Sequence, residues 1–409
     1  MADETVDKEG GKMPVYWIWL SLLPDLSLRQ KNQILQHFSD AEELYFTEPE
    51  KLEELPAEVI KALSNKDLAP AEKVLRICTR KNIGILTWAD AQYPRRLRNI
   101  ADPPVLLYYS GTIPDWEHQP IIAVVGTRKA SPYGISAAKK LSRQITACGG
   151  MVISGCASGI DGAAMQGALD IGSNTVGVLG NGVDVVYPRT NRGLYGKVVK
   201  GGCLLSEYEP GSRPERWHFP QRNRILSGIA DGVLVIEAPE RSGALITARC
   251  ALEQGRDVFA VPGNIDAPTC EGSNALLQDG AITALNGWDI MKEYEAHYPN
   301  VVGNRKVPLV QESAAETVTY VAQKIILPME LPDKKDIDKP AVTPYSGIEK
   351  LTEEEQKLLA CLTGDPKPVD DVIAVFGQSS GKTLSMLTKL ALQGLVQNHP
   401  GRLVSRKER

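Results

Sequence analysis

The stretch IIAVVGTRKASPYG, residues 121–134, carries an apolar run directly into the start of a helix. Five consecutive apolar residues, 121–125, are typical of a strand that is buried on both faces, as in parallel sheets. Gly126 allows the chain to turn closely. Ser131 before Pro132 is the pattern of a helix N-cap followed by proline at the first helical position. This stretch therefore predicts one β–α unit of a parallel α/β fold.

The same alternation of apolar strands and amphipathic helices repeats along the centre of the chain. The predicted strands cover 121–125, 151–154, 175–179, 203–207, 233–236 and 258–261, with shorter ones at 84–87 and 103–109. The predicted helices lie around 135–147, 160–169, 193–199, 222–229 and 245–253. Apolar strands separated by helices predict a Rossmann-like, doubly wound, mostly parallel sheet that is covered on both faces.

Composition and punctuation divide the chain further. The start is polar, and the segment that follows has short amphipathic helical patterns broken at Pro24 and Pro56. A proline-rich, charged stretch follows the α/β centre, and the tail shows three helices and a hairpin-like ending. The predicted parts are a disordered start (1–12), an all-helical domain (13–80), an extended Rossmann-like domain (81–300), a linker (301–349) and a winged-helix-like domain (350–409).

Charge and cysteine usage exclude several classes of protein. The formal net charge is −4 over 409 residues, so a site for a polyanion must be a local basic patch. The seven cysteines are odd in number and include no C-x-x-C pair, which favours free thiols in a reducing cytosol. The five histidines have no metal-ligand spacing, and no apolar run is long enough to span a bilayer. We expect a soluble, cytoplasmic protein without a metal or a membrane anchor.

Most of the predicted strands end in loops rich in glycine, hydroxyl or arginine side chains. Loops that follow the carboxyl ends of parallel strands gather in one crevice. Backbone N–H groups at helix starts, hydroxyls and arginine cations all favour a phosphate. Each loop alone also fits an ordinary strand-to-helix turn whose glycines serve packing. The dinucleotide fingerprint G-x-G-x-x-G is absent, so NAD is disfavoured and we expect no cofactor.

A local basic patch follows the loop after the predicted strand at 175–179. Between Arg189 and Arg224 there are eight Lys or Arg residues against three Glu. Trp217 and Phe219 lie beside the sequence Arg-Asn-Arg at 222–224. Aromatic rings interleaved with arginines suit single-stranded nucleic acid, because its bases stack while its phosphates pair with cations. The alternative is that both rings fill the core beneath a solvated loop.

The motifs occur in a defined order. They are Gly-Thr-Arg at 126–128, Ser-Gly-x-Ala-x-Gly-Ile-Asp at 154–161, Leu-Gly-x-Gly at 179–182, Phe-Pro-x-Arg-Asn-Arg at 219–224 and Ser-Gly-x-Leu-Ile-Thr-Ala at 242–248. In order and spacing they resemble the bacterial DNA-processing protein A family, also called Smf, most strongly from about 84 to 290. The helical start resembles that family's sterile-alpha-motif-like (SAM-like) domain, and the tail resembles its winged-helix domain.

The resemblance implies a non-catalytic protein that binds single-stranded DNA during natural transformation, forms a homodimer and loads the RecA recombinase. Arg128 would hold a phosphate, and Arg189 stands where the family usually has lysine. Arg222 and Arg224 belong to the shared Arg-Asn-Arg motif. The candidate DNA-contacting residues are Gly126, Thr127, Arg128, Ser131, Gly155, Gly159, Gly180, Gly182, Arg189, Asn191, Phe219, Arg222, Asn223, Arg224, Ser242, Gly243 and Thr247.

Other interpretations compete with this one. A Rossmann-like nucleotide enzyme of the phosphoribohydrolase type needs a working glutamate, but Cys250 stands at the comparable position after Thr247. A third possibility, a purely protein-binding scaffold, predicts no salt-dependent affinity for DNA. The segment 377–383 resembles an ATP phosphate loop but is one residue short and lies between two predicted helices. The last tail helix carries only Lys382 and Lys389, so contact with duplex DNA and contact with protein are both open.

Overall fold

A computed structural model of the chain describes residues 13–38, 40–48, 52, 55–305, 352–378, 380–392, 395–399 and 403–407. The predicted disordered start, 1–12, lies outside the described residues, as does the predicted linker beyond residue 305. The chain divides between Tyr320 and Val321 into two units, each described by itself below.

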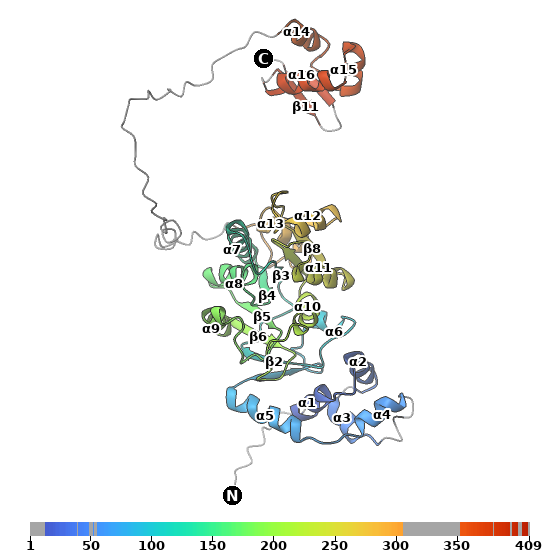
Figure 1. The fold of residues 1–409 in the computed structure, drawn as a ribbon, viewed down its shortest axis with the longest axis vertical. Coiled ribbons are helices and arrows are strands. Elements are labelled where there is room, and N and C mark those ends of the chain that lie inside the picture. The colour runs from blue at the N-terminus through green and yellow to red at the C-terminus, as the bar shows by residue number, and fades with distance from the viewer. Residues whose placement is uncertain are drawn as a thin grey trace, which may run out of the picture. The chain divides into compact units, whose positions relative to one another are not determined.

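The first unit begins with helices, as the sequence predicts (Figure 1). These are α1 (Pro14–Leu22), α2 (Leu28–His37), α3 (Ala41–Phe46), α4 (Ala57–Leu63) and α5 (Ala69–Lys81). Helix α1 is almost entirely apolar, and Trp17 and Ile18 are fully buried. The core of these helices is continuous with one face of the sheet, where it includes Val105, Leu106 and Tyr108. The helical start therefore shares a hydrophobic core with the α/β part.

In the described part of the chain, nine strands form one sheet in the order β1-β2-β6-β5-β4-β3-β7-β8-β9. They are β1 (Gly84–Thr87), β2 (Leu106–Gly111), β3 (Ile121–Val125), β4 (Met151–Ser154), β5 (Thr175–Leu179), β6 (Gly202–Ser206), β7 (Gly232–Val235), β8 (Asp257–Ala260) and β9 (Ile282–Thr283). Strands β1 and β2 pair antiparallel with their neighbours, and all other pairs are parallel. The predicted Rossmann-like sheet is confirmed, with β9 as an additional short edge strand.

Helices cover both faces of this sheet (Figure 1). One face packs against α7 (Pro132–Ala147), α8 (Ile160–Asp170) and α13 (Gly287–Met291). The other packs against α6 (Arg95–Arg98), α10 (His218–Ile229) and α11 (Gly243–Glu253), while α9 (Arg192–Lys200) packs with the helical start. Because the parallel strands have covers on both sides, their residues are apolar throughout, which explains the unbroken runs in the sequence.

Helix α10 begins earlier than predicted. The sequence places its start at residue 222, whereas the helix starts at His218 and includes Pro220 in its first turn. Proline is tolerated there because the first N–H groups of a helix have no partner within the helix. Trp217 and Phe219 therefore lie at a helix N-terminus instead of in an extended loop.

The second unit has the predicted winged-helix architecture. It contains α14 (Glu353–Ala360), β10 (Lys367–Pro368), α15 (Val369–Phe376), α16 (Ser380–Leu392), β11 (Val396–His399) and β12 (Leu403–Arg406). The strands form a three-stranded sheet in the order β10-β12-β11. Lys382 pairs with Glu354 of α14 at 2.8 Å, and Lys389 pairs with Glu355 at 2.9 Å. These two cations of α16 are therefore bound by α14.

The described residues contain neither a membrane-spanning helix nor a cluster of metal ligands. None of their helices combines the length and the apolar character that crossing a bilayer requires. Nor do three or more His, Cys, Asp or Glu side chains in this part of the chain gather as ligands of a metal ion would.

Candidate functional site

The topology of the sheet creates a crevice between β3 and β7. The chain continues from β3 to β4 on one side, whereas β7 and β8 extend the sheet on the other. Open α/β sheets bind ligands at such a switch point, outside the carboxyl ends of the strands. A pocket of about 320 Å³ lies there, lined by the loops after β3 and β7 and by the starts of α8, α10 and α11. Thr127, Arg128, Arg241 and Gly243 are among its lining residues.

A second pocket, of about 240 Å³, adjoins the first along the same edge of the sheet. It is lined by the loops after β4 and β5, and Arg128 and Phe219 belong to both pockets. The guanidinium carbon of Arg128 lies 4.8 Å from the centroid of the Phe219 ring. The ring of Tyr187 lies 5.7 Å from Phe219 on another side. A cation and two aromatic rings therefore form the boundary between the pockets.

The aromatic residues of the basic patch are not core residues. Trp217 is 56% exposed, and Phe219 is partly exposed at the wall of both pockets. This observation contradicts the alternative in which both rings fill the core. The patch therefore places aromatic surface along the crevice.

Several arginine side chains in the loops at this edge are exposed and have no ion-pair partner in the part of the chain that the structure describes, and three of them follow the strands around the two pockets. They are Arg128 in the loop after β3, Arg189 in the loop after β5, and Arg241 in the loop after β7. Arg128 and Arg189 are candidates from the sequence, whereas Arg241 is not among them. The signal was available, because Arg241 directly precedes Ser242, which caps the helix that follows the strand across the switch point.

The N-terminus of α7 is occupied by a carboxylate of the chain itself. Glu237, which is 1% exposed, accepts hydrogen bonds from the Ser131 N–H at 2.9 Å and the Ser131 hydroxyl at 2.5 Å. The predicted contact between Ser131 and a phosphate is therefore contradicted, because Glu237 already holds both of its donors. Sequence reasoning missed this pair because its members are far apart in the chain.

The N-terminus of α8 also carries a carboxylate. Asp161 is buried in the first turn and accepts a hydrogen bond from the Ala157 N–H at 3.3 Å. Burial raises the pKa of the Asp161 carboxyl, while the nearby Arg222 cation opposes this shift. Since Asp161 lines the pocket at the switch point, its negative charge opposes an anion bound close to α8.

The N-terminus of α11 differs from the other two. Its cap is Ser242, whose hydroxyl accepts a hydrogen bond from the Ala244 N–H at 3.2 Å. A Cβ added at Gly243 would meet nothing within 4 Å, so a ligand can approach this backbone closely. Arg241 precedes the cap, and Thr247 is buried in the wall of the same pocket. The helix dipole and the N–H groups of the first turn favour an anion at this position.

The other glycines of the loops are packed against atoms of the protein, which leaves no room for a ligand beside their α-carbons. An added Cβ would lie 3.0 Å or less from other atoms of the protein at Gly126, Gly155, Gly159, Gly180 and Gly182. At Gly159, φ is +79° and the added atom would lie 2.4 Å from the carbonyl oxygen of Thr127, so a side chain would be both strained and obstructed. The structure therefore favours the packing alternative at these positions.

Arg222 and Arg224 correct the sequence prediction. The Arg222 side chain is buried, and its Nη1 donates to the carbonyl oxygens of Gly155, at 3.0 Å, and Val178. Arg224 Nη2 donates to both carboxylate oxygens of Glu207, at 2.7 and 2.6 Å. Both guanidinium groups are held by the protein, so neither offers an unpaired cation to a phosphate.

Two asparagines of the motifs hold loops in place. Asn191 Nδ2 donates to the carbonyl oxygens of Cys156 at 2.9 Å and Ala157 at 3.1 Å. Asn223 Nδ2 donates to the carbonyl oxygen of Gly243 at 3.2 Å. These hydrogen bonds hold the loop after β4 and the start of α11 in position, and both segments line the crevice.

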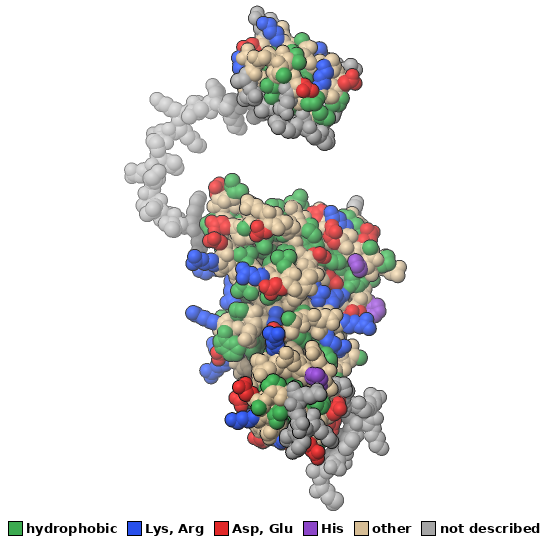
Figure 2. Space-filling view, turned by 90° about the vertical axis from the view of Figure 1, so that its right-hand side faces the viewer, with side chains coloured by type: hydrophobic (Ala, Val, Ile, Leu, Met, Phe, Trp, Pro, Cys, Tyr) green, Lys and Arg blue, Asp and Glu red, His purple; other side chains and the backbone are tan. Residues whose placement is uncertain are grey.

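The surface charge is mixed. On the face shown in Figure 2, Lys and Arg side chains lie among acidic ones and do not form one continuous field. This agrees with a formal net charge of −4. A polyanion is therefore attracted by local groups of cations and not by the net charge of the chain.

These features define a Rossmann-like α/β protein with an arginine-lined crevice at its switch point and a winged-helix domain at its C-terminal end. The chain belongs to the family of DNA recombination-mediator protein A, whose model matches residues 84–295. The model of the DprA winged helix domain matches residues 342–402. The family resemblance stated from the sequence is thus confirmed, and it assigns the chain a role in DNA processing.

Individual relatives support this assignment. The protein Smf of Synechocystis is 31% identical over 407 residues, covering 96% of this chain and 98% of the relative. The protein Smf of Escherichia coli is 35% identical over 315 residues, covering 76% of this chain and 75% of the relative. The X-ray structure of DNA processing protein A from Streptococcus pneumoniae superposes with a TM-score of 0.60 at 34% identity, covering 69% of this chain and 99% of that one.

Proposed function

We propose that this protein binds single-stranded DNA along the crevice at the carboxyl edge of its sheet, without catalysing a reaction on it. The observation that carries the proposal is that the exposed Arg128 and Arg241 line one pocket together with Phe219. Arg189 is exposed in the loop after β5, next to Pro188, which lines the adjoining pocket. Such cations bind phosphates of any sequence, and exposed rings offer stacking surfaces to unpaired bases. A duplex, whose bases are already stacked, would gain nothing from the rings.

The phosphate position that we propose is the start of α11. Gly243 leaves room for an oxygen beside the backbone, Arg241 supplies charge, and Arg128 lines the same pocket from the opposite loop. The other two helix starts present Glu237 and Asp161 to their own N–H groups. The strand would therefore cross the switch point with a phosphate at α11 and bases toward Phe219.

The same carboxylates argue against an enzyme. Glu237 is bound by Ser131, and Asp161 accepts a backbone hydrogen bond, so both carboxylates already have donor groups of the chain as partners. Cys250, which stands where a phosphoribohydrolase would have its glutamate, is absent from the lining of the pocket at the switch point. Burial raises the pKa of its thiol, which disfavours a nucleophilic thiolate. Release of free base from nucleotides by the purified protein would revive the enzyme interpretation.

We also propose that the bound strand is delivered to the RecA recombinase and that the protein acts as a homodimer. The support for delivery is the description of the family as recombination mediators. The support for a dimer is the resemblance stated from the sequence. Light scattering would measure the oligomeric state, and RecA filament assembly on coated single strands would measure delivery.

The binding proposal is tested by fluorescence anisotropy with labelled single-stranded and double-stranded oligonucleotides of equal length at several salt concentrations. We expect a preference for the single strand and an affinity that falls as salt rises, because counterions are released from the phosphates. Equal affinity for both forms, or an affinity independent of salt, would contradict the proposal.

The site is tested by the double variant Arg128→Ala with Arg189→Ala. Loss of two phosphate contacts is expected to weaken single-strand binding about 30-fold, with little dependence on base sequence, and to reduce the salt slope by about two. Arg80→Ala is the matched control, since Arg80 is an exposed arginine in the last turn of α5. If Arg80→Ala weakens binding as much as the crevice variant does, net charge and not the crevice determines affinity.

A further inference from the structure

The largest pocket near the crevice lies where the helical start meets the sheet. Its volume is about 1010 Å³, and it is lined by the end of α1, the start of α2, strand β2 and the segment after β6. Neighbouring residues of the chain line this pocket and the crevice. Trp217 and His218 line this pocket, and the next residue, Phe219, lines the two pockets of the crevice. His218 Nδ1 lies 3.0 Å from the carbonyl oxygen of Gly180, which lines the neighbouring pocket.

One buried donor of the lining, Nη1 of Arg224, has no hydrogen-bond partner among the described residues. The Tyr108 hydroxyl, on a side chain that is 1% exposed, lies beside the Ser21 hydroxyl in the same lining. An unpaired buried donor costs stability, so Nη1 of Arg224 indicates a ligand that presents an acceptor to it.

The charges of the lining exclude a phosphate as the preferred ligand. Three cations lie there, on Arg29, Lys31 and Arg224, and they are balanced by three carboxylates, on Asp102, Glu207 and Glu209. Burial also lowers the pKa of Lys31 to about 8, which weakens its hold on an anion. A neutral ligand with both donors and acceptors fits this set better than a polyanion does.

Aromatic surface completes the lining. Trp217 is 56% exposed, and its Nε1 donates to Glu215 Oε2 at 2.7 Å, which fixes the ring. Next to it, the rings of Tyr208 and His218 stack with centroids 3.8 Å apart. A flat heteroaromatic ligand can therefore stack on a ring that is already positioned.

We infer that this pocket receives a nucleobase of the bound single strand, turned out of the crevice past Phe219 and stacked on Trp217. The inference rests on the proposed function, because the base belongs to the strand that the crevice holds. Tyr108 and Arg224 donate to ring or carbonyl acceptors of the base, and Glu209 accepts from its N–H groups. The helical start thus forms part of the DNA site.

The test compares two probes of equal length, about 15 nucleotides: an oligodeoxythymidylate and a strand with the same backbone but no bases. Trp217→Ala is expected to weaken binding of the thymidylate strand about tenfold and to leave binding of the abasic strand unchanged. Phe46→Ala is the matched control, because Phe46 is an exposed aromatic residue of α3 outside the pocket. It should change neither affinity.

Tyr108→Phe provides a second variant that removes only the buried hydroxyl. We expect severalfold weaker binding of the thymidylate strand and unchanged binding of the abasic strand. Unchanged affinity for both strands would show that the hydroxyl makes no contact with a base.

The outcomes separate the two proposals. If the wild-type protein binds neither probe, both the proposed function and the base pocket are wrong. If it binds both and Trp217→Ala changes neither affinity, or both equally, only the base pocket is wrong. If thymidine monophosphate binds in a manner that depends on Trp217 while the strand does not, the pocket takes a free nucleotide and the inference from the strand is overturned.

Discussion

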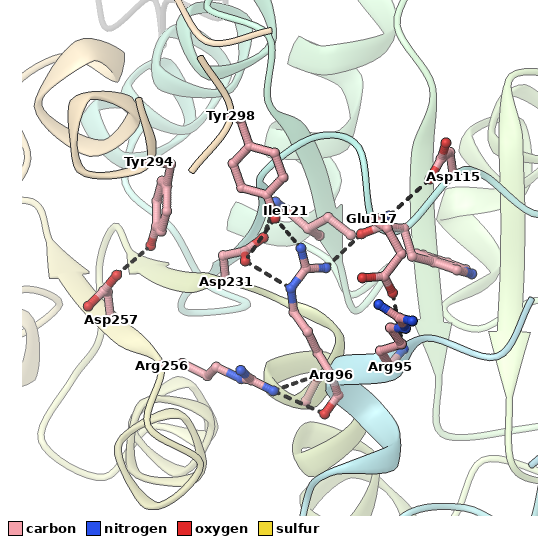
Figure 3. Close-up of polar contacts among 12 residues, drawn as sticks. Arg95, Arg96, Asp115, Glu117, Ile121, Asp231, Arg256, Asp257, Tyr294 and Tyr298 are labelled. Atoms are coloured by element: carbon pink, nitrogen blue, oxygen red, sulfur yellow. Dashed lines mark hydrogen bonds and ion pairs between the residues drawn. The ribbon is translucent and has the colours of Figure 1, made fainter. Parts of the chain in front are cut away.

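At the amino edge of the sheet, Arg96 and Arg256 are bound by the chain's own groups, whereas at the carboxyl edge Arg128, Arg189 and Arg241 have no ion-pair partner among the described residues. Figure 3 shows the amino edge. Arg96 Nε lies 2.9 Å from Asp231 Oδ1, and Arg96 Nη2 donates to the Tyr298 hydroxyl. Arg256 Nη2 donates to the carbonyl oxygen of Arg96 at 3.0 Å, and Asp231 also accepts the Ile121 N–H at 2.8 Å.

Whether these arginines are bound or free depends on which donor groups the neighbouring carboxylates bind. At the amino edge, Asp231 meets both an arginine and a backbone N–H. At the carboxyl edge, Glu237 and Asp161 bind donor groups at the starts of α7 and α8. Arg128, Arg189 and Arg241 therefore keep their charge available to a ligand, whereas Arg224 at the same edge is paired with Glu207. The same residue type stabilises the fold at one edge and is free to bind at the other because of its acidic neighbours.

The largest effect is expected from breaking the amino edge. Arg96→Ala leaves the Asp231 carboxylate, whose side chain is 15% exposed, without its cation. Removal of one partner of a buried pair costs about 3 kcal/mol of unfolding free energy. Urea denaturation followed by tryptophan fluorescence measures this loss, because all six tryptophans lie in the first unit. Single-strand affinity of the folded variant should equal that of the wild type; a large loss of affinity would show that the edges are coupled.

A smaller effect is expected from Arg241→Ala at the carboxyl edge. Loss of one phosphate contact should weaken single-strand binding about tenfold and leave the unfolding free energy within about 0.5 kcal/mol of wild type. Anisotropy and urea denaturation measure the two quantities. A loss of stability without a loss of affinity would show that Arg241 stabilises the fold, as Arg96 does, and does not bind the strand.

The smallest effect on single-strand affinity is expected when one buried carboxyl at each edge is replaced, Asp161 at the carboxyl edge and Asp231 at the amino edge. Asp161→Asn removes a negative charge from the pocket and should tighten single-strand binding about threefold. Asp231→Asn should lower stability and leave affinity unchanged. Because burial raises the pKa of Asp161, protonation removes its charge as pH falls, so wild-type binding should tighten toward acid pH. Anisotropy across pH would show this trend in the wild type, and its persistence in Asp161→Asn would exclude Asp161 as the cause.

The sequence predicted the features that depend on local patterns. The apolar run at 121–125 and the cap at Ser131 located a strand and a helix start correctly. The alternation of strands and helices placed the crevice at the carboxyl edge, and the isolated arginines Arg128 and Arg189 are exposed there.

The features that the sequence did not predict depend on partners far along the chain. Glu237 reaches Ser131 from the loop after β7, and Arg222 is buried against a carbonyl of the loop after β4 and one of strand β5. Nothing local distinguishes a buried arginine such as Arg222 from an exposed one such as Arg241. Only the folded structure shows which cations already have partners.

The contact between Glu237 and Ser131 has a consequence for the kinetics of binding. It connects the loop after β7 to the loop after β3, and these loops form the two walls of the crevice. The walls cannot separate unless a buried carboxylate loses its hydrogen bonds. A strand that enters therefore meets a preformed groove and loses little affinity to ordering of the protein. Association should then be limited by electrostatically steered diffusion and not by an opening step.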